Sequence, residues 1–458
     1  MPNKSLEVNG FVIKEYMSNV KVFRDQQAFF YDKNRFFWAW IPLEKRWDKW
    51  DEIDVLNCLD NSLKLEGSIV VSGYRNNYLE ACKWVGRRNM PQFVKDSWVQ
   101  FNDQIIDIAS GEQFESSSEY FTKNPIPWDI GDSEDTPNID RLFEDWVGKD
   151  YVKTLYEIVA FSIVPSYFIH RVFCFIGSGL NGKSCFMKLL RKFIGESNGC
   201  SVDLDFLLVS RFEKARLYGK LYCQIGETNF NEMKRTSVLK ALSGQDSMGF
   251  EFKNKELFDS VNYAKLIIST NSLPPTSDKT EGFYRRWMII NFYNKFNEKR
   301  DVLAEIPDEE YKNLARKSLR IAKELWVDRS FTNEGTIAER TERYEDLSNP
   351  LKKFVDMNTE EDTEGIIYRF KFKQQFELYC KENSFRTWTD VQLNKAMNDM
   401  EHVGTGKKRI DWSEKVIGDD GKLSVVESVR HVWCWIGIRW KKDPNRHPPI
   451  PKGEERVK

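Results

Sequence analysis

Glycines and a lysine near the middle of the chain have the spacing of a phosphate-binding loop. Residues 177–184 read Gly-Ser-Gly-Leu-Asn-Gly-Lys-Ser and fit the pattern G-x-x-x-x-G-K-[ST]. Glycines let backbone N–H groups turn inward around an anion, and a helix that follows points its positive end at the phosphates. Lys183 can then reach the β- and γ-phosphates of ATP, and the Ser184 hydroxyl can bind Mg²⁺. The alternative is a glycine-rich turn with a chance lysine, but the apolar segment before the loop favours the nucleotide site.

The eight residues of this candidate ATP-binding loop are Gly177, Ser178, Gly179, Leu180, Asn181, Gly182, Lys183 and Ser184.

Two polar residues follow apolar segments that we expect to be strands of the same sheet. Glu227 follows one segment about 40 residues after Lys183, and its carboxylate can hold or activate the attacking water. Asn271 ends the segment Lys-Leu-Ile-Ile-Ser-Thr-Asn, and its amide can orient that water and sense the γ-phosphate. Each is also compatible with an ordinary strand end, as a solvated carboxylate or a turn residue. Ligands bind at the carboxyl edge of such sheets, which favours the functional interpretation.

A pair of arginines, Arg285 and Arg286, directly precedes another apolar segment. A guanidinium presented by a neighbouring subunit can neutralise transition-state charge on the γ-phosphate. We favour Arg286 for this role because its backbone adjoins the strand. A surface pair with carboxylate partners is the alternative.

These residues require a scaffold that brings strand ends together. Apolar segments at 172–176, 221–225, 264–269 and 287–292 alternate with helical patterns, beginning with 183–193. This alternation predicts a parallel sheet with covering helices, an α/β architecture.

The flanking segments differ from this pattern. Before it, a buried strand at 36–40, a hairpin at 98–108 and a linker at 131–138 predict an α+β domain. After it, an acidic break at 358–364 precedes two helices, and 431–440 is expected to pair with 410–416. The predicted domains are 1–140, 141–350 and 351–440, with a disordered basic tail at 441–458.

Composition excludes several classes of protein. Lys and Arg total 69 against 70 Asp and Glu, so any contact with DNA must come from local basic clusters. The eight cysteines form no Cys-x-x-Cys pair, which argues against structural zinc and predicts free thiols. No apolar run reaches the 18 or so residues that span a bilayer, and the first ten residues contain no signal-peptide core. We expect a cytoplasmic protein with no membrane partner.

Together, the motifs resemble those of the superfamily 3 helicases, a viral and plasmid branch of the AAA+ ATPases. The similarity is greatest to the poxvirus and phage/plasmid primase-helicases, in which Asn181 before Gly-Lys-Ser is characteristic. The resemblance covers about residues 100–300, and more loosely the remainder. The matching segments are 177–184, 226–227, 239–246, 267–271 and 283–287.

The resemblance implies an AAA+-like P-loop ATPase core that forms a homo-oligomeric ring, a hexamer, with ATP sites between subunits. It implies 3′-to-5′ movement along DNA held in the central channel, in replication initiation of a phage, plasmid or pathogenicity island. One position departs from the family, which often has an acidic residue where this chain has Gly226. Mg²⁺ would therefore depend on Ser184, phosphates and water.

DNA contacts are expected in two places. In the family, a hairpin following residue 246 grips the DNA backbone, and Lys253 and Lys255 suit a phosphate grip without sequence preference. Phe250 and Phe252 are more consistent with core packing. The C-terminal module resembles a winged helix, which binds duplex DNA or protein. No primase signature is visible in the first 145 residues, so a primase would be a separate partner.

Two other functions remain open from the sequence. An origin-binding initiator could use ATP only for assembly, without processive unwinding. A small-molecule phosphotransferase could be built on the same loop, although the pair Arg285 and Arg286 argues against it.

Overall fold

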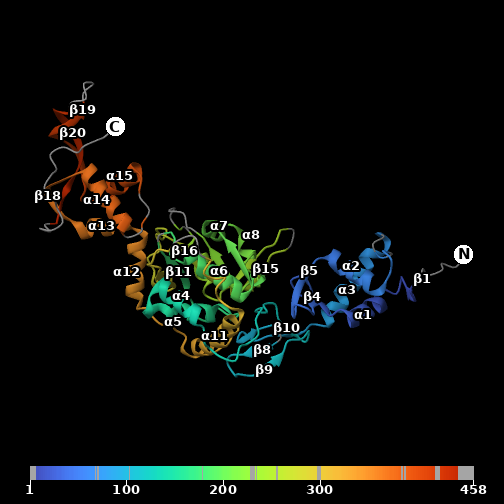
Figure 1. Ribbon diagram of the computed structural model, residues 1–458. Coiled ribbons are helices and arrows are strands. Elements are labelled where there is room, and N and C mark those ends of the chain that lie inside the picture. Colours follow the sequence, from blue (N-terminus) through green and yellow to red (C-terminus); the bar gives the residue numbers. More distant parts are fainter. Residues whose placement is uncertain are drawn as a thin grey trace. The chain divides into compact units, whose positions relative to one another are not determined.

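The computed structural model describes a mixed α/β protein in two compact units (Figure 1). The first unit comprises Met1–Thr270 and Thr276–Thr341, and the second comprises Asn271–Pro275 and Glu342–Lys458. The described residues are 7–441, except 68, 70–71, 103, 178, 227–232, 234, 254–255, 297–300, 383–384, 386–387 and 418–422.

The N-terminal part of the first unit combines helices with a small antiparallel sheet. The order of that sheet is β3-β4-β5, and β4 is almost entirely buried, which confirms the strand predicted at 36–40. Asp51 begins α2 with a capping box, in which its side chain accepts from two backbone N–H groups. The elements are β1 (Glu7–Val8), β2 (Phe11–Val12), α1 (Tyr16–Gln26), β3 (Phe29–Tyr31), β4 (Phe37–Ile41), β5 (Arg46–Trp50), α2 (Glu52–Leu63) and α3 (Ser72–Arg88).

A second group of short strands follows α3 in the sequence and precedes the central sheet. β7 and β8 pair as an antiparallel hairpin with Trp98 opposite Asp107, which confirms the hairpin predicted at 98–108. The elements are β6 (Gln92–Phe93), β7 (Trp98–Gln100), β8 (Gln104–Asp107), β9 (Gln113–Glu115) and β10 (Tyr120–Phe121).

The central sheet has five parallel strands in the order β12-β13-β16-β11-β17. Its middle strands are rich in apolar residues and almost wholly buried, as expected for strands covered on both faces. The four segments predicted as strands are confirmed. The sheet also has a strand at its edge, β12, that was not predicted. The strands are β11 (Val172–Ile176), β12 (Gly199–Val202), β13 (Tyr222–Ile225), β16 (Lys265–Thr270) and β17 (Trp287–Asn291).

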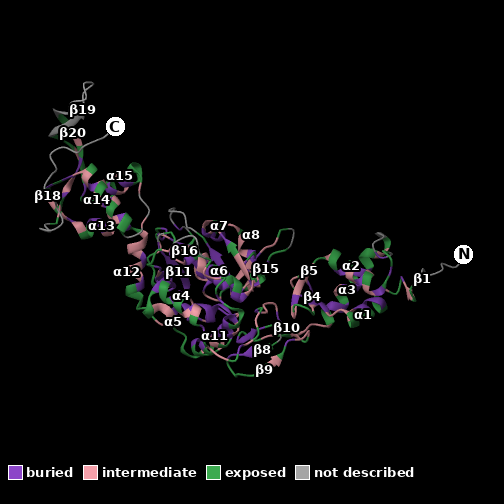
Figure 2. Cartoon of the chain, in the orientation of Figure 1, coloured by how far each residue is buried: buried purple, intermediate pink, exposed green. Residues whose placement is uncertain are grey.

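Helices before, within and after the sheet share one large core with it, and buried residues dominate this region (Figure 2). Gly148, with a φ of +78°, ends α4, so the long helical segment predicted here is two helices. The elements are α4 (Pro137–Val147), η1 (Lys149–Tyr151), α5 (Val152–Ser162), α6 (Lys183–Ile194), η2 (Glu196–Asn198), α7 (Leu204–Val209), α8 (Arg211–Ala215), α9 (Thr236–Leu242), α10 (Glu281–Tyr284), α11 (Asp308–Asp328) and α12 (Ile337–Ser348), with the hairpin β14 (Ser247–Phe250) and β15 (Phe258–Val261).

The second unit contains a three-stranded antiparallel sheet in the order β18-β20-β19, with helices packed on it. The pairing predicted between 431–440 and 410–416 is wrong: 410–416 pairs with 424–430, and 431–436 pairs with 404–409. The prediction that the acidic segment 358–364 is a break is also wrong, because this segment runs into the start of β18. The elements are α13 (Pro350–Asn358), β18 (Thr359–Tyr368), α14 (Arg369–Glu382), α15 (Asp390–Asn398), β19 (Gly404–Ile417) and β20 (Leu423–Trp440).

Two further findings concern the whole of the described chain. All eight cysteines lie in it and are free, as predicted. None of the helices described between residues 7 and 441 combines the length and the apolar character needed to cross a bilayer. The predicted tail at 441–458 lies, apart from Lys441, outside the described residues.

Candidate functional site

The predicted phosphate loop joins β11 to α6, and glycine is required at Gly182, directly before the helix. β11 is buried along its whole length, and α6 begins at Lys183. Gly182 has a φ of +94°, and a Cβ there would lie 2.3 Å from Cδ1 of Trp146. Gly182 also occupies the N-cap of α6 and supplies no side-chain cap. The loop therefore packs closely against a buried tryptophan. It leads into the N-terminus of α6, where no capping side chain accepts a hydrogen bond from the first backbone N–H groups.

The Lys183 side chain turns back into the loop. Its ammonium donates to the carbonyl of Gly177 and, at 3.0 Å, to Oδ1 of Asn181. Asn181 in turn donates 3.2 Å from Nδ2 to the carbonyl of Phe292, just after β17. Asn181 thus fixes both the loop and the lysine, a role that its place in the motif did not reveal. Ser184 is exposed in the first turn of α6, and Ser178 lies outside the described residues.

The strand order places the other predicted residues in relation to this loop. β16 lies between β11 and β13, with Thr270 level with Ile176 and Ile225 level with Ile268. Asn271 follows Thr270 directly and is the first residue of the second unit. Glu227 follows β13 by two positions but lies outside the described residues. The roles assigned to Glu227 and Asn271 stay predictions.

The two arginines differ in exposure. Arg285 is exposed, whereas Arg286 is 7% exposed and donates from Nη1 to the carbonyl of Gly282. The backbone carbonyl of Arg286 accepts a 2.6 Å hydrogen bond from Val172, the first residue of β11. Burial, followed by the charges of Arg286 and Arg285, lowers the pKa of nearby His170. A guanidinium that reaches a neighbouring subunit must be accessible, and of the two only Arg285 is.

The hairpin expected to contact DNA is present as β14 and β15, which pair with Phe250 opposite Phe258. Phe250 is fully buried, as expected for core packing, and Phe252 is half-buried. Lys253 is exposed in the connecting turn, and Lys255 lies outside the described residues.

Basic side chains also line β19 in the second unit. Lys407, Lys408 and Arg409 are exposed, and the Lys407 ammonium lies 4.6 Å from the ring centroid of Trp433 on β20. Trp433 is itself half exposed. The second of the two helices predicted in this module is α15, which Thr389 begins with a capping box.

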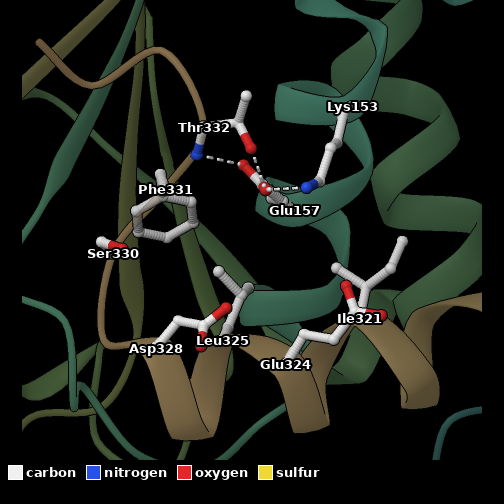
Figure 3. Close-up of a pocket in the computed structure, with 9 residues that line it drawn as sticks. All are labelled: Lys153, Glu157, Ile321, Glu324, Leu325, Asp328, Ser330, Phe331 and Thr332. Carbon is white, nitrogen blue, oxygen red and sulfur yellow. Dashed lines mark hydrogen bonds and ion pairs between the residues drawn. The ribbon is translucent and has the colours of Figure 1, made fainter.

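A small cavity of about 140 Å³ beside α5 has a structural role (Figure 3). Glu157 accepts 2.8 Å and 2.6 Å hydrogen bonds from the backbone and hydroxyl of Thr332, and Lys153 lies 3.9 Å away. These bonds tie α5 to the segment after α11, and burial raises the pKa of Glu157. Across the described parts of the chain, His, Cys, Asp and Glu side chains form no group of three or more able to hold a metal ion.

Comparisons with known proteins match part of this site. A family of unknown function (DUF5906) matches residues 175–286, from the end of β11 to Arg286. No curated protein matches the chain. Solved structures similar to it include the A-form apo structure of the C-terminal region of NrS-1, which is 16% identical with a TM-score of 0.47 and covers 84% of this chain and 86% of that chain. Two structures of NrS-1 residues 305–718 are each 15% identical, with TM-scores of 0.46 and 0.45; each covers 93% of this chain, and 99% and 100% of its own.

Proposed function

We propose that the chain is an ATP-dependent DNA helicase that forms a hexameric ring, moves 3′ to 5′ and acts in replication initiation of a phage, plasmid or pathogenicity island. One observation carries the ATPase part. Gly182, with a left-handed backbone, and an inward-turned Lys183 lie between a fully buried strand and a helix N-terminus without a side-chain cap. This combination of elements suits an anion with several charges.

Three residues of the loop have roles in this proposal. Lys183 leaves the Gly177 carbonyl and Asn181 to bind the β- and γ-phosphates, while Asn181 stays bonded to the Phe292 carbonyl and holds the loop's shape. The exposed Ser184 hydroxyl fits a single protein ligand for Mg²⁺, which when bound neutralises charge on the phosphates.

The remaining catalytic roles are assigned to residues predicted from the sequence, two of them after strands of the sheet and one in a neighbouring subunit. Glu227 activates the water and Asn271 orients it. We assign the arginine that completes the site of an adjacent subunit to Arg285 rather than Arg286, because Arg286 is buried and bonded within its own chain. Head-to-tail contacts in a ring create such shared sites.

DNA binding is assigned to two basic features. The exposed Lys253 at the hairpin turn, with Lys255, holds single-stranded DNA in the channel. The winged-helix-like second unit, with Lys407 beside Trp433 and the exposed Arg409 on the same strand, contacts duplex origin DNA or another protein. A primase is a separate chain.

The test uses purified protein with ATP, Mg²⁺ and two forked DNAs whose tails differ in polarity. We expect DNA-stimulated ATP hydrolysis and strand separation only from the fork with a 3′ tail. Hydrolysis without separation would favour an initiator whose ATP use drives assembly. Phosphate transfer to a small acceptor, without stimulation by DNA, would favour a phosphotransferase.

A further inference from the structure

A second cavity, of about 520 Å³, lies in the first unit away from the phosphate loop. It opens where the β3-β4-β5 sheet, the edge strand β12 and the β14–β15 hairpin meet. Its volume falls within the range of sites that hold small organic ligands. Most of the side chains that line it are cationic or aromatic: Arg46, Lys49, Lys123, Arg216 and Lys220, with Trp38, Trp47, Tyr218 and Phe252.

The cations in this cavity outnumber the carboxylates. Asp48 is the one carboxylate in the lining, and it already lies 3.3 Å from Arg46. Arg216 is paired outside the cavity with Glu213 at 3.1 Å. Among the described residues, no carboxylate lies within 4.0 Å of the ammonium groups of Lys123 or Lys220. Lys220 donates 2.5 Å from its ammonium to the Ser197 carbonyl, so neither its charge nor that of Lys123 is paired with a carboxylate in the described chain.

Two ammonium groups share the same aromatic rings. Lys49 lies 5.7 Å from the centroid of Trp38 and 5.1 Å from that of Tyr218. Lys123 lies 5.7 Å and 5.2 Å from the same two centroids. Rings attract cations, but two like charges at one pair of rings repel each other. An anion placed in the cavity would offset that repulsion.

The acid whose charge acts on Lys123, Asp32, is already engaged. Asp32 accepts hydrogen bonds of 2.9 Å from the Phe36 backbone and 2.8 Å from the Trp38 indole, so its carboxylate is held by neutral donors. Burial accordingly lowers the pKa of Lys123 to about 8, an effect that Asp32 only partly opposes. A buried ammonium without a bonded partner is costly, and a ligand oxyanion would supply one.

We propose that this cavity binds the phosphate group of a nucleotide, free or within a single strand of nucleic acid, with Lys123 and Lys220 as its main ligands. The half-buried rings of Tyr218 and Phe252 supply apolar surface for the attached sugar or base. The site is separate from the phosphate loop and does not require ATP hydrolysis.

Continuity with the hairpin favours a strand as the source of the phosphate. Phe252 lines the cavity, and the next residue, Lys253, is the exposed cation at the hairpin turn. On the proposed function, Lys253 holds the strand, which therefore passes close to Phe252 in the cavity wall. Successive phosphates could then be bound by the turn and by the cavity.

The experiment measures binding of a fluorescein-labelled oligothymidylate of about 20 nucleotides by anisotropy, in a Lys183→Ala background that disables the phosphate loop. Lys123→Met keeps side-chain length among the rings and removes the charge. We expect affinity to fall roughly tenfold and the salt slope to become shallower by about one unit. Lys220→Met, at a position outside the ring cluster, should weaken binding in the same direction.

Lys323→Met, an exposed lysine on α11, is the matched control and should bind as the background does. Calorimetric titration with AMP, then with inorganic phosphate, distinguishes the sources. If AMP binds and Lys123→Met abolishes that binding, the cavity takes a free nucleotide. If only the binding of the oligonucleotide depends on Lys123, the phosphate belongs to a strand. The proposal is overturned if both cavity variants, shown to be folded by thermal unfolding, bind oligonucleotide and AMP as the background does.

Discussion

Replacing Gly182 with alanine should destabilise the first unit, because two features of this position exclude a Cβ atom. The φ of +94° is one that residues with a side chain rarely adopt. A Cβ would also lie 2.3 Å from Cδ1 and 2.5 Å from Nε1 of Trp146. Trp146 is buried and packs near the rings of Phe143, Phe186 and Phe292, so it has little room to move.

The two penalties can be sized separately. A left-handed backbone costs an alanine about 1–2 kcal/mol. Forcing an extra carbon into a packed core costs about 1–3 kcal/mol. Together they give about 2–5 kcal/mol, and at about 2 °C per kcal/mol for a large domain we expect the Tm to fall by roughly 4–10 °C.

The assay is thermal unfolding followed by circular dichroism, without nucleotide. Gly179→Ala is the matched control, because a Cβ there meets nothing within 4 Å and the φ is not left-handed. Its Tm should stay within about 1 °C of the wild type. Equal shifts for both variants, or none for Gly182→Ala, would refute the account of the loop's packing.

Three other predictions concern the rest of the molecule. Lys253→Ala should weaken single-strand binding regardless of sequence and make the salt slope shallower by about one unit; unchanged affinity at two salt concentrations would move the DNA contact elsewhere. Mixing Arg285→Ala with Lys183→Ala subunits should restore part of the ATPase activity that each lacks, since an arginine finger contributes about 10³–10⁵ in rate; a flat line at all ratios would contradict a shared site, and recovery with Arg286→Ala instead would return the role to that residue. Burial raises the pKa of Glu157, so the folded state binds its proton more tightly and the free energy of unfolding falls as pH rises from the ordinary carboxyl value through the raised one. Glu157→Gln should flatten that fall in urea titrations at a series of pH values above the ordinary carboxyl pKa, and identical profiles would argue that the carboxyl is not perturbed.

The central strands could be predicted because each is a short apolar run that a polar or glycine residue ends. β11 is the clearest case, since the predicted 172–176 is the observed strand. β12 could not be predicted in this way. Gly199–Val202 contains no apolar run and pairs with β13 alone, so only the neighbouring strand makes it a strand.

In the C-terminal sheet, the alternation of apolar and polar residues was not enough to predict how the strands pair. β20 runs without interruption through 423–440, so one strand pairs with 404–417 along most of its length and with β18 near its end. Alternation is compatible with several registers, and the turn that selects one cannot be read from it. The acids of β18 read as a break because they are solvent-facing or partly exposed on an edge strand, where Arg439 lies 2.6 Å from Glu360.

The loop motif could be predicted from spacing, but the surroundings of its residues could not. The burial of Arg286 depends on segments distant in the chain, and so does the bond from Asn181 to the carbonyl of Phe292. The cavity around Lys123 is assembled from several separate segments, none of which has a recognisable pattern.

The most direct test of the central claim is equilibrium binding of a fluorescent ATP analogue with Mg²⁺ to the wild type and to Lys183→Ala. Lys188→Ala, an exposed lysine one turn further along α6, is the control. We predict saturable binding by the wild type and the control, competed by ATP, and loss of binding in Lys183→Ala at an unchanged Tm. Equal affinity in all three proteins would contradict an ATP site at this loop.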